Sequence, residues 1–251
     1  MKKLTLPPEP PELTANEATL TTRYKATGES VWKQEYITEA LLKMSGGKCA
    51  YSEQPLNTQS NYMEVEHFRH KKMYPDDVVR WGNLLPSCKK CNTTKGEWDV
   101  EKEPIVNPLV DEPSEHLMVQ AFRYYAKTPK GQNTIKAVAL NDRQHFVTPR
   151  AKIAMKIADS LEELSDHIGE LKQRHRQKII AETIKSYLKE CAMPDSPYSA
   201  VIATFLLHDW KNYPVMKQQL QSLNMWDEEF AAIENSLKRV AMPFSDITSE
   251  D

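Results

Sequence analysis

The fold of this 251-residue chain is decided by residues 48–96, KCAYSEQPLNTQSNYMEVEHFRHKKMYPDDVVRWGNLLPSCKKCNTTKG. The helical hydrophobic period of the preceding segment stops here. Two short strand-like stretches, Tyr62–Glu66 and Trp81–Leu85, are separated by turn-forming residues, and a short helix can begin near Cys91. We therefore expect a small module of strand, loop, strand and helix that is bounded by cysteines.

Three of the four cysteines belong to this segment, namely Cys49, Cys88 and Cys91, whereas Cys191 is a lone thiol at a helix end. Two C-x-x-C knuckles suit tetrahedral Zn²⁺, because each supplies two thiolates from one tight turn. The second knuckle is complete. The first has Ser52 in place of its second cysteine, and a hydroxyl is a poor zinc ligand.

The fourth ligand of such a site is open at this point. Glu53, His70 or a water molecule can complete a three-cysteine zinc site, or the site is weak or empty. The alternative is that the thiols pack as small buried groups and hold no metal. A disulfide scaffold is not expected in a chain this long with so few cysteines.

A carboxylate, a histidine and two amides lie among the cysteines. Glu66 offers the oxygen ligands that Mg²⁺ prefers, and His67, with an ordinary pKa of about 6.5, can take a proton from water. Asn92 follows Cys91, so the knuckle would fix its amide oxygen as a further ligand. Asn83 can hydrogen-bond the main chain near the histidine. Each residue alone is weak evidence, because single asparagines are common in turns.

Taken together, these residues resemble the HNH nuclease module, a two-stranded finger with a helix that holds one metal ion. The matching text, similar to the zinc-knuckle branch of that family, is Glu66-His67-Phe68, Trp81-x-Asn83-Leu84-Leu85, Cys88-x-x-Cys91-Asn92 and Lys95-Gly96. Within that branch the chain is most similar to the HNH nuclease (PtuB-like) subunits of Septu and retron-associated anti-phage systems. The later text that extends this resemblance is Ile105-Val106-Asn107-Pro108.

The resemblance implies roles for the residues that match. His67 would be the general base that activates water, and Asn83 would orient it. Glu66 and Asn92 would bind a catalytic Mg²⁺ or Mn²⁺, beside a structural Zn²⁺ at the cysteines. The resemblance also implies a PtuA-like SMC/ABC ATPase as partner, with a retron reverse transcriptase and its small DNA as further candidates.

Two positions depart from the family pattern. Ser52 replaces a cysteine that is common in the first knuckle, which leaves the zinc count open. His70 stands where relatives often have proline. It can be a substrate contact, a zinc ligand or an exposed side chain, and we expect it to be exposed.

Local charge supports a nucleic-acid face. The whole chain carries 33 basic and 35 acidic residues, a net charge of −2 and a pI near 6.4, unlike a freestanding nucleic-acid binder. Within 66–96, seven basic residues exceed three acidic ones. A second basic run at 172–189 is either a nucleic-acid path or a solvated helix face. The expected substrate contacts are Arg69, Lys71, Lys72 and Lys95.

Composition bounds the remaining possibilities. The mean hydropathy is −0.62, and no apolar run reaches the roughly 18 residues of a membrane-spanning helix. The first residues lack the apolar stretch of a secretory signal, so we expect a soluble cytoplasmic protein. No P-loop is present, so ATP use would come from a partner.

The chain as a whole is expected to be α+β and mainly α. We expect an extended, partner-binding, proline-rich arm at 1–30, the HNH module with a preceding helix at 31–110, and a helical region at 111–251. The alternative for residues 1–30 is a disordered tail. The helical periodicity is found at 31–44, 150–168, 171–191, 197–210 and 226–240.

The sequence therefore predicts a metal-dependent HNH endonuclease that hydrolyses nucleic acid. DNA is preferred over RNA as the expected substrate, with RNA such as tRNA left open. The alternative is a non-catalytic zinc-knuckle adaptor that binds nucleic acid or the ATPase. The complete set of Glu66, His67, Asn83 and Asn92 favours the enzyme, because an adaptor needs no general base.

Overall fold

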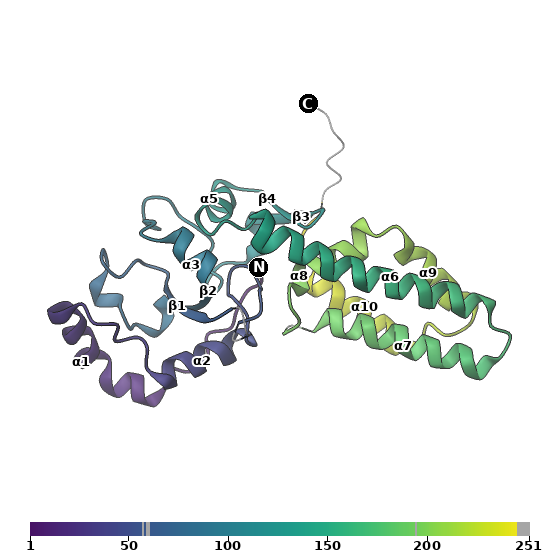
Figure 1. Ribbon diagram of the computed structural model, residues 1–251, viewed down its shortest axis with the longest axis horizontal. Coiled ribbons are helices and arrows are strands. Elements are labelled where there is room, and N and C mark those ends of the chain that lie inside the picture. The colour runs from purple at the N-terminus through teal and green to yellow at the C-terminus, as the bar shows by residue number, and fades with distance from the viewer. Residues whose placement is uncertain (57, 59–60, 194, 245–251) are drawn as a thin grey trace, which may run out of the picture. The chain divides into compact units, whose positions relative to one another are not determined.

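A computed structural model of the chain describes residues 1–56, 58, 61–193 and 195–244 (Figure 1). The chain forms two compact units, which are described separately: Met1–Leu117 with Tyr125–Asp142, and Met118–Tyr124 with Arg143–Asp251. Helices dominate the described residues, beside two small two-stranded sheets, so the architecture is α+β and mainly α. None of the helices described combines the length and apolar character that crossing a membrane requires.

The first unit contains the short sheet that the sequence predicts. Its elements are α1 (Pro11–Thr27), α2 (Glu35–Ser45), β1 (Met63–His67), β2 (Leu84–Cys88), α3 (Lys89–Lys95), α4 (Pro113–His116) and α5 (Pro129–Ala137). β1 and β2 pair antiparallel, with Glu66 opposite Leu85 and His67 opposite Leu84. α3 begins directly after β2 and packs against both strands, and its last residue, Lys95, donates a hydrogen bond to His67 O at the end of β1.

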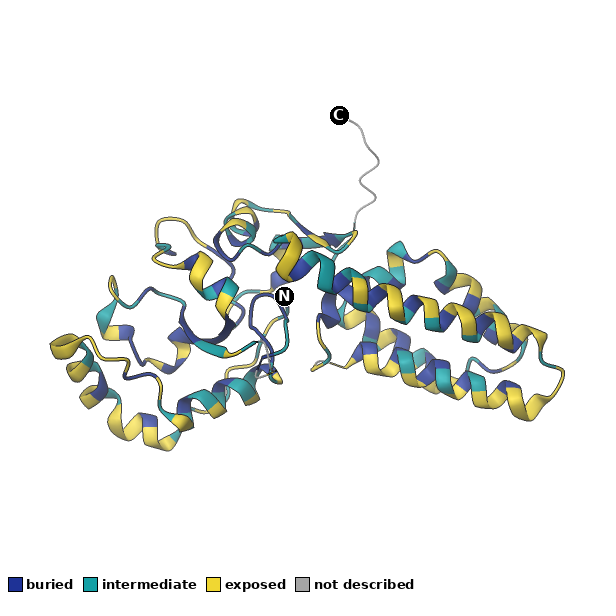
Figure 2. Cartoon of the chain, in the orientation of Figure 1, coloured by how far each residue is buried: buried dark blue, intermediate teal, exposed yellow. Residues whose placement is uncertain are grey.

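One hydrophobic core packs the sheet against the two N-terminal helices, α1 and α2. α2 turns an apolar face inward and ends at Gly46, whose φ of 61° is the left-handed conformation that glycine adopts without strain. The buried core residues are Leu13, Leu20, Val31, Trp32, Ile37, Leu41, Val65, Val78, Val79, Trp81 and Leu84 (Figure 2). The core thus joins both strands to α1 and α2.

Residues 11–27, expected to be extended, instead form α1. Pro11 occupies the first helical position, where its missing N–H costs no hydrogen bond, and Gly28 ends the helix at a φ of 72°. Only Leu13 and Leu20 are buried on this helix. Its polar sequence therefore gives almost no periodic signal, which explains the error.

The proline-rich residues before α1 bond to the first unit. Leu4 N donates to Pro108 O at 2.7 Å, and Trp81 Nε1 donates to Pro7 O at 2.9 Å. The ammonium of Met1 lies 3.3 Å from the Glu53 carboxylate, with both groups buried. This segment is thus held by its own unit, and the expected partner-binding role of residues 1–30 stays a prediction.

A hairpin and a helical bundle complete the chain. β3 (Leu117–Gln120) and β4 (Arg123–Ala126) pair with each other. The bundle contains α6 (Thr148–Glu170), α7 (Arg174–Ala192), α8 (Ser199–Thr204), α9 (Asn212–Ser222) and α10 (Glu228–Val240), with π-helical turns at Arg143–Val147 and Phe205–Asp209. α7 packs against both α6 and α10, around buried residues that include Leu161, Ile184, Leu188, Phe230 and Leu237 (Figure 1).

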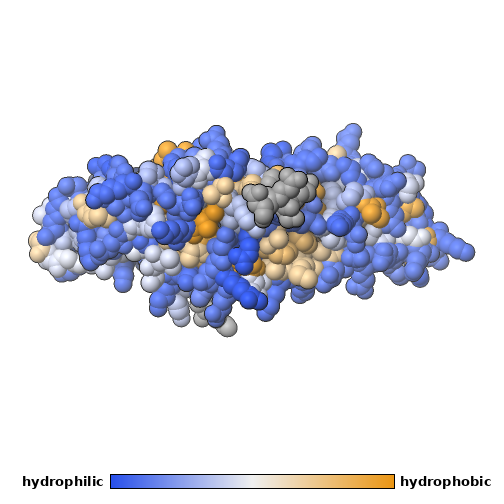
Figure 3. Space-filling view, turned by 90° about the horizontal axis from the view of Figure 1, so that it is seen from above, coloured by the Kyte–Doolittle hydropathy of each residue, from blue (hydrophilic) through white to orange (hydrophobic). Residues whose placement is uncertain are grey.

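The helical prediction for this region is largely confirmed. The expected stretches 150–168, 171–191 and 226–240 correspond to α6, α7 and α10. The stretch 197–210 is α8 followed by a π-helical turn, and α9 was not predicted. In the view of Figure 3 the surface of the bundle is largely hydrophilic, with a few hydrophobic residues among the polar ones, as is normal for a water-exposed helical surface.

Candidate functional site

The three cysteines of the module meet in one buried cluster. The Sγ atoms of Cys49, Cys88 and Cys91 all lie within 4.8 Å of one another. Cys88 ends β2 and caps α3, and Cys91 lies in the first turn of α3. Cys49 lies in the turn after α2, which is tied to β2 by a hydrogen bond from Ala50 N to Pro86 O at 2.8 Å. Three converging thiols are a donor set that can hold a metal ion, and Zn²⁺ suits it.

Ser52 occupies the side of this cluster where a fourth ligand would stand. The serine is fully buried, and its Oγ lies 3.8 Å from the Sγ of Cys88. Burial raises the pKa of the Cys49 thiol, but hydrogen bonds with Cys88, Cys91 and Ser52 outweigh it and hold that pKa well below its usual range. A thiolate is therefore favoured within the cluster, and a thiolate is what a metal ion requires.

The other two candidates for the fourth ligand are placed elsewhere. Glu53 pairs with the Met1 ammonium and lies 4.0 Å from Lys48 Nζ. His70 is not part of the cysteine cluster among the described residues.

The fourth cysteine, Cys191, lies outside this cluster. Cys191 is buried near the end of α7, where burial raises the pKa of its thiol to about 12, so it is an unreactive core residue.

Glu66 and His67 lie next to each other at the end of β1, and both are buried. The Nζ of Lys95, on α3, lies 2.5 Å from Glu66 Oε1 and donates a hydrogen bond to His67 O at 2.8 Å. Burial raises the pKa of Glu66 to about 7, although Lys95 opposes the rise. The enclosed oxygen of this carboxylate is Oε1, whereas Oε2 is not shielded in that way.

The tautomer of His67 follows from its hydrogen bond. His67 Nε2 lies 2.9 Å from Val78 O, and a carbonyl oxygen only accepts, so Nε2 carries the proton. The lone pair is then on Nδ1, which is the ring nitrogen that can accept a proton. Trp32 contacts the imidazole edge-on, with 4.7 Å between ring centroids. Burial first, and then Lys71, lower the pKa of His67 to about 3, so the ring is neutral near pH 7.

This buried neutral histidine makes the stability of the chain sensitive to acid. In the unfolded state His67 has a pKa of about 6.5, whereas in the folded state its pKa is about 3. The unfolded state therefore takes up this proton first as the pH falls, and the contribution of His67 to the unfolding free energy decreases between pH 6.5 and pH 3. Glu66, with its raised pKa, acts in the opposite direction. From pH 7 to pH 5, wild type should lose about 2 kcal/mol of unfolding free energy relative to His67→Gln, measured by urea titration. An unchanged difference between the two proteins would contradict the buried neutral state.

Asn83 fixes the loop that follows the histidine. Its Oδ1 accepts from Arg69 N at 2.7 Å, and its Nδ2 donates to Arg69 O at 3.1 Å and to Asp77 O at 2.9 Å. The residue lies in a 3₁₀ turn, Trp81–Asn83, just before β2 and not in the strand where we expected it. Its side chain thus ties two parts of the loop together close to His67.

Asn92 contacts a residue that sequence reasoning missed. Its Nδ2 donates to Glu64 Oε2 at 2.5 Å. Glu64 and Glu66 alternate along β1 and so lie on the same face of that strand, toward α3. The two glutamates and Asn92 offer oxygen ligands of the kind that Mg²⁺ and Mn²⁺ prefer. The alternation of the two glutamates was the signal that could have identified Glu64.

The four expected substrate contacts have different surroundings. Lys95 is buried, with its ammonium on Glu66 and His67 O, an arrangement that does not support the expected substrate contact. Arg69 pairs with Glu101 at 2.7 Å and with Asp77 at 3.4 Å, and Lys72 pairs with Glu97. Lys71 is half-buried with its Nζ 5.0 Å from the ring centroid of Trp32, beside His67.

The burial of Lys95 predicts a large loss of stability when its charge is removed. In Lys95→Met, the Glu66 carboxylate would stay buried without its cation, which costs about 3–5 kcal/mol of unfolding free energy. Urea titration measures this loss. Lys72→Met is the matched control, because its ion pair is exposed and contributes little. Equal losses in the two variants would contradict the structural role of Lys95.

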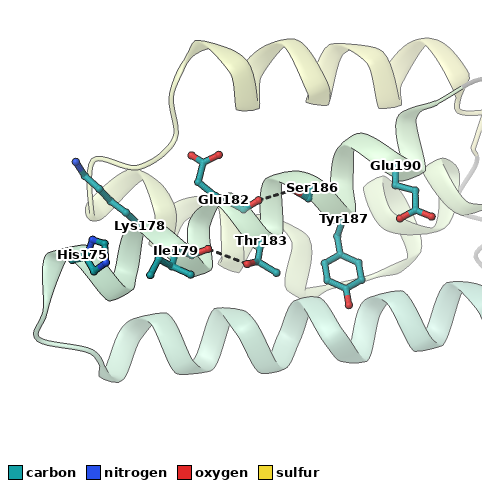
Figure 4. Close-up of a pocket in the computed structure, with 8 residues that line it drawn as sticks. All are labelled: His175, Lys178, Ile179, Glu182, Thr183, Ser186, Tyr187 and Glu190. Carbon is teal, nitrogen blue, oxygen red and sulfur yellow. Dashed lines mark hydrogen bonds between the residues drawn. The ribbon is translucent and has the colours of Figure 1, made fainter.

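The second basic run, 172–189, is not a continuous positive surface. Lys185 is buried and pairs with Glu182, Asp227 and Glu229, and Arg174 donates to Leu223 O and Asn224 O. A shallow hollow on the surface of α7 is lined in part by acidic Glu182 and Glu190 (Figure 4). The arrangement favours a solvated helix face over a nucleic-acid path.

Comparisons with known proteins assign the chain to a family. No family model matches the chain, and no solved structure matches it. The Septu protein PtuB of Bacillus thuringiensis is 37% identical over 245 residues, covering 95% of this chain and 94% of the relative. The Septu protein PtuB of Bacillus mycoides (strain KBAB4) is 29% identical over 238 residues, covering 76% of this chain and 80% of the relative. At this identity and coverage, the chain belongs to the PtuB family of Septu proteins.

Proposed function

We propose that this chain is the metal-dependent HNH endonuclease of a Septu anti-phage defence system and hydrolyses phosphodiester bonds of nucleic acid. The observation that carries the proposal is the state of His67. It is neutral, its Nε2 is fixed by Val78 O, and the lone pair of its Nδ1 is left for a water molecule. Glu66, the next residue along β1, is the carboxylate that a metal-assisted reaction needs.

The polar residues on and around β1 and α3 have distinct roles in the proposed reaction. His67 Nδ1 takes the proton of the attacking water, and the hydrogen bond to Val78 O keeps the ring in the correct orientation. Glu66, with Glu64 and Asn92 nearby, would hold Mg²⁺ or Mn²⁺, which stabilises charge on the phosphate and the leaving oxygen. Lys95 fixes the Glu66 carboxylate by its Oε1, and Asn83 fixes the loop after His67. Lys71 is the basic residue best placed to meet a substrate phosphate.

We further propose that Cys49, Cys88 and Cys91 bind a structural Zn²⁺. The donor set fits, because three buried thiols converge and Ser52 leaves the fourth position to its hydroxyl or a water molecule. An ion here would join the turn after α2 to the start of α3. It would thereby hold Asn92 against Glu64 on β1.

Partners follow from the family. We propose a PtuA-like SMC/ABC ATPase that controls the nuclease, since the chain has no P-loop of its own. DNA is the preferred substrate class, and tRNA is a second one for the assay. A retron reverse transcriptase with its small DNA is a further candidate partner in systems that encode one.

A non-catalytic adaptor is favoured by one observation. Glu66 is 2% and His67 3% exposed, and Glu66 already has Lys95 as its counter-ion. Such burial would suit a purely structural module. Against this, an adaptor gains nothing from a neutral histidine beside an unpaired carboxylate oxygen, and His67 Nδ1 and Glu66 Oε2 are not enclosed.

The deciding experiment is a cleavage assay on the chain alone and on the chain co-purified with its ATPase. Plasmid DNA and total tRNA are offered with Mg²⁺ or Mn²⁺ and with chelator. Cleavage should require the divalent ion and the His67 side chain, and should persist in His175→Ala, an exposed histidine on α7. No cleavage by the complex under any condition would favour the adaptor.

A further inference from the structure

His70 is buried, contrary to the expectation of an exposed side chain. It is 8% exposed, and its Nδ1 is fully enclosed without a hydrogen-bond partner among the described residues. Its Nε2 is not enclosed and also has no partner there. An enclosed N–H without a partner costs more than an enclosed lone pair, so the favoured tautomer carries its proton on Nε2. The ring therefore presents one N–H donor outward.

The main chain holds this ring in place. His70 O accepts hydrogen bonds from Met73 N at 3.0 Å and from Tyr74 N at 2.9 Å, which close a tight turn. The preceding residue, Arg69, is fixed through both main-chain groups by Asn83. A side chain on such a braced turn is preorganised, because little conformational freedom is left to lose on binding.

The surroundings of His70 favour an anion. Lys71 and Lys72 follow it directly. Burial first, and then Lys71 and Lys95, lower the pKa of His70, whereas Glu97, which is paired with Lys72, opposes that shift. Lys72 and Lys95 already pair with carboxylates, but no carboxylate lies within ion-pair distance of Lys71 among the described residues. A cation would be repelled by this group of lysines. A phosphate oxygen would meet one neutral donor and one unpaired ammonium.

We propose that His70 is a substrate-binding residue, whose Nε2–H donates a hydrogen bond to a backbone phosphate of nucleic acid that Lys71 also contacts. The inference rests on the proposed nuclease function and adds a neutral phosphate contact beside the general base. Its place near His67 is consistent with this, since His70 is one of the groups that act on the pKa of His67. The phosphate bound here would be the scissile one or its neighbour.

The test compares three replacements of His70 that differ in where they place a donor. The side-chain amide of His70→Gln reaches the position of Nε2, that of His70→Asn reaches only the position of Nδ1, and His70→Leu has no donor. Binding of a labelled DNA duplex and of labelled tRNA is measured by fluorescence anisotropy without added Mg²⁺ or Mn²⁺ and without chelator, so that cleavage is not supported and a structural Zn²⁺ at the cysteines stays in place. The full chain is used, alone and with its ATPase. We expect Kd to rise about fivefold to tenfold in His70→Leu and His70→Asn and to stay within about twofold in His70→Gln.

The salt dependence of Kd distinguishes the contribution of His70 from that of Lys71. A neutral donor releases no counterion, so His70→Leu should leave the slope of log Kd against log salt unchanged. Lys71→Met should reduce that slope by about one. Thermal unfolding of each variant shows whether the chain is folded, and the recovery in His70→Gln shows that a lost donor, and not a damaged turn, is responsible.

Each outcome bears on a different claim. An unchanged Kd in folded His70→Leu, or equal weakening in His70→Gln, overturns the role of His70 and leaves the nuclease proposal standing. Loss of the ATPase from His70→Leu with unchanged nucleic-acid binding would place a protein contact here and overturn the phosphate contact. Absence of binding by the wild-type complex to both probes would overturn the proposed function and this inference with it.

Discussion

His67→Ala is expected to cleave nucleic acid about 10²- to 10⁴-fold more slowly than wild type under single-turnover conditions. That is the usual contribution of a positioned general base. The ring is neutral near pH 7, and its Nε2 proton is committed to Val78 O, so Nδ1 is the atom whose loss slows the reaction. Cleavage is measured as a first-order rate with saturating enzyme, with Mn²⁺ present, on whichever substrate wild type cuts.

A second replacement separates chemistry from structure. In His67→Gln the side-chain amide can still donate to Val78 O, but it offers no base. We expect this variant to be as inactive as His67→Ala and closer to wild type in thermal stability. His175→Ala should match wild type in both respects, because His175 is exposed on α7. A His67→Gln enzyme that cuts at the wild-type rate would exclude His67 as the base and would leave its role purely structural.

The parts of the site that depend on residue spacing could be predicted from the sequence. Cysteines that bound a strand, a loop and a strand leave few ways to bring Cys49 to Cys88 and Cys91, and the three thiols do converge. The hydrogen bonding of Asn83 to the main chain near His67 was also predicted, and its side chain does bond the main chain of Arg69. These features depend on sequence neighbours and on one antiparallel pairing.

Other features depend on packing that no local pattern encodes. Lys95 and His70 are polar residues that sequence patterns place at the surface, but α3 and the turn after β1 bury both. Glu64 resembles an ordinary strand residue until α3 brings Asn92 to it. α1 is polar on most of its surface and buries only Leu13 and Leu20, so its helix is stabilised by contacts far along the chain.

The same packing explains how the thiol cluster and the proposed catalytic residues depend on each other. α3 carries Cys91 for the cluster, Asn92 for Glu64 and Lys95 for Glu66, all within two turns. A loss of order at Cys91 would therefore displace the groups that hold β1. Stability and cleavage should be lost together when the cluster is disturbed.

Removing the metal from the cysteine cluster is accordingly expected to have the largest effect on folding. Structural zinc contributes apparent free energies of about 10–16 kcal/mol in small zinc-finger peptides, and binding energy at such sites is folding energy. We expect about one Zn²⁺ per chain in wild type and almost none in Cys91→Ala, measured by mass spectrometry of metals. Prolonged chelation should lower the melting temperature of wild type to that of Cys91→Ala.

Two further variants make this prediction sharp. Cys191→Ala removes a buried thiol outside the cluster, so it should keep its zinc and its response to chelator. Ser52→Cys places a thiol next to Cys88, where the serine hydroxyl now lies 3.8 Å from Cys88 Sγ, and should complete the tetrahedral set. We expect zinc to leave Ser52→Cys more slowly than wild type when a coloured chelator competes for it. Wild type purified without zinc, with a melting temperature that chelator does not change, would show that the three thiols only pack together. In that case α3 would be held by its contacts with the two strands alone.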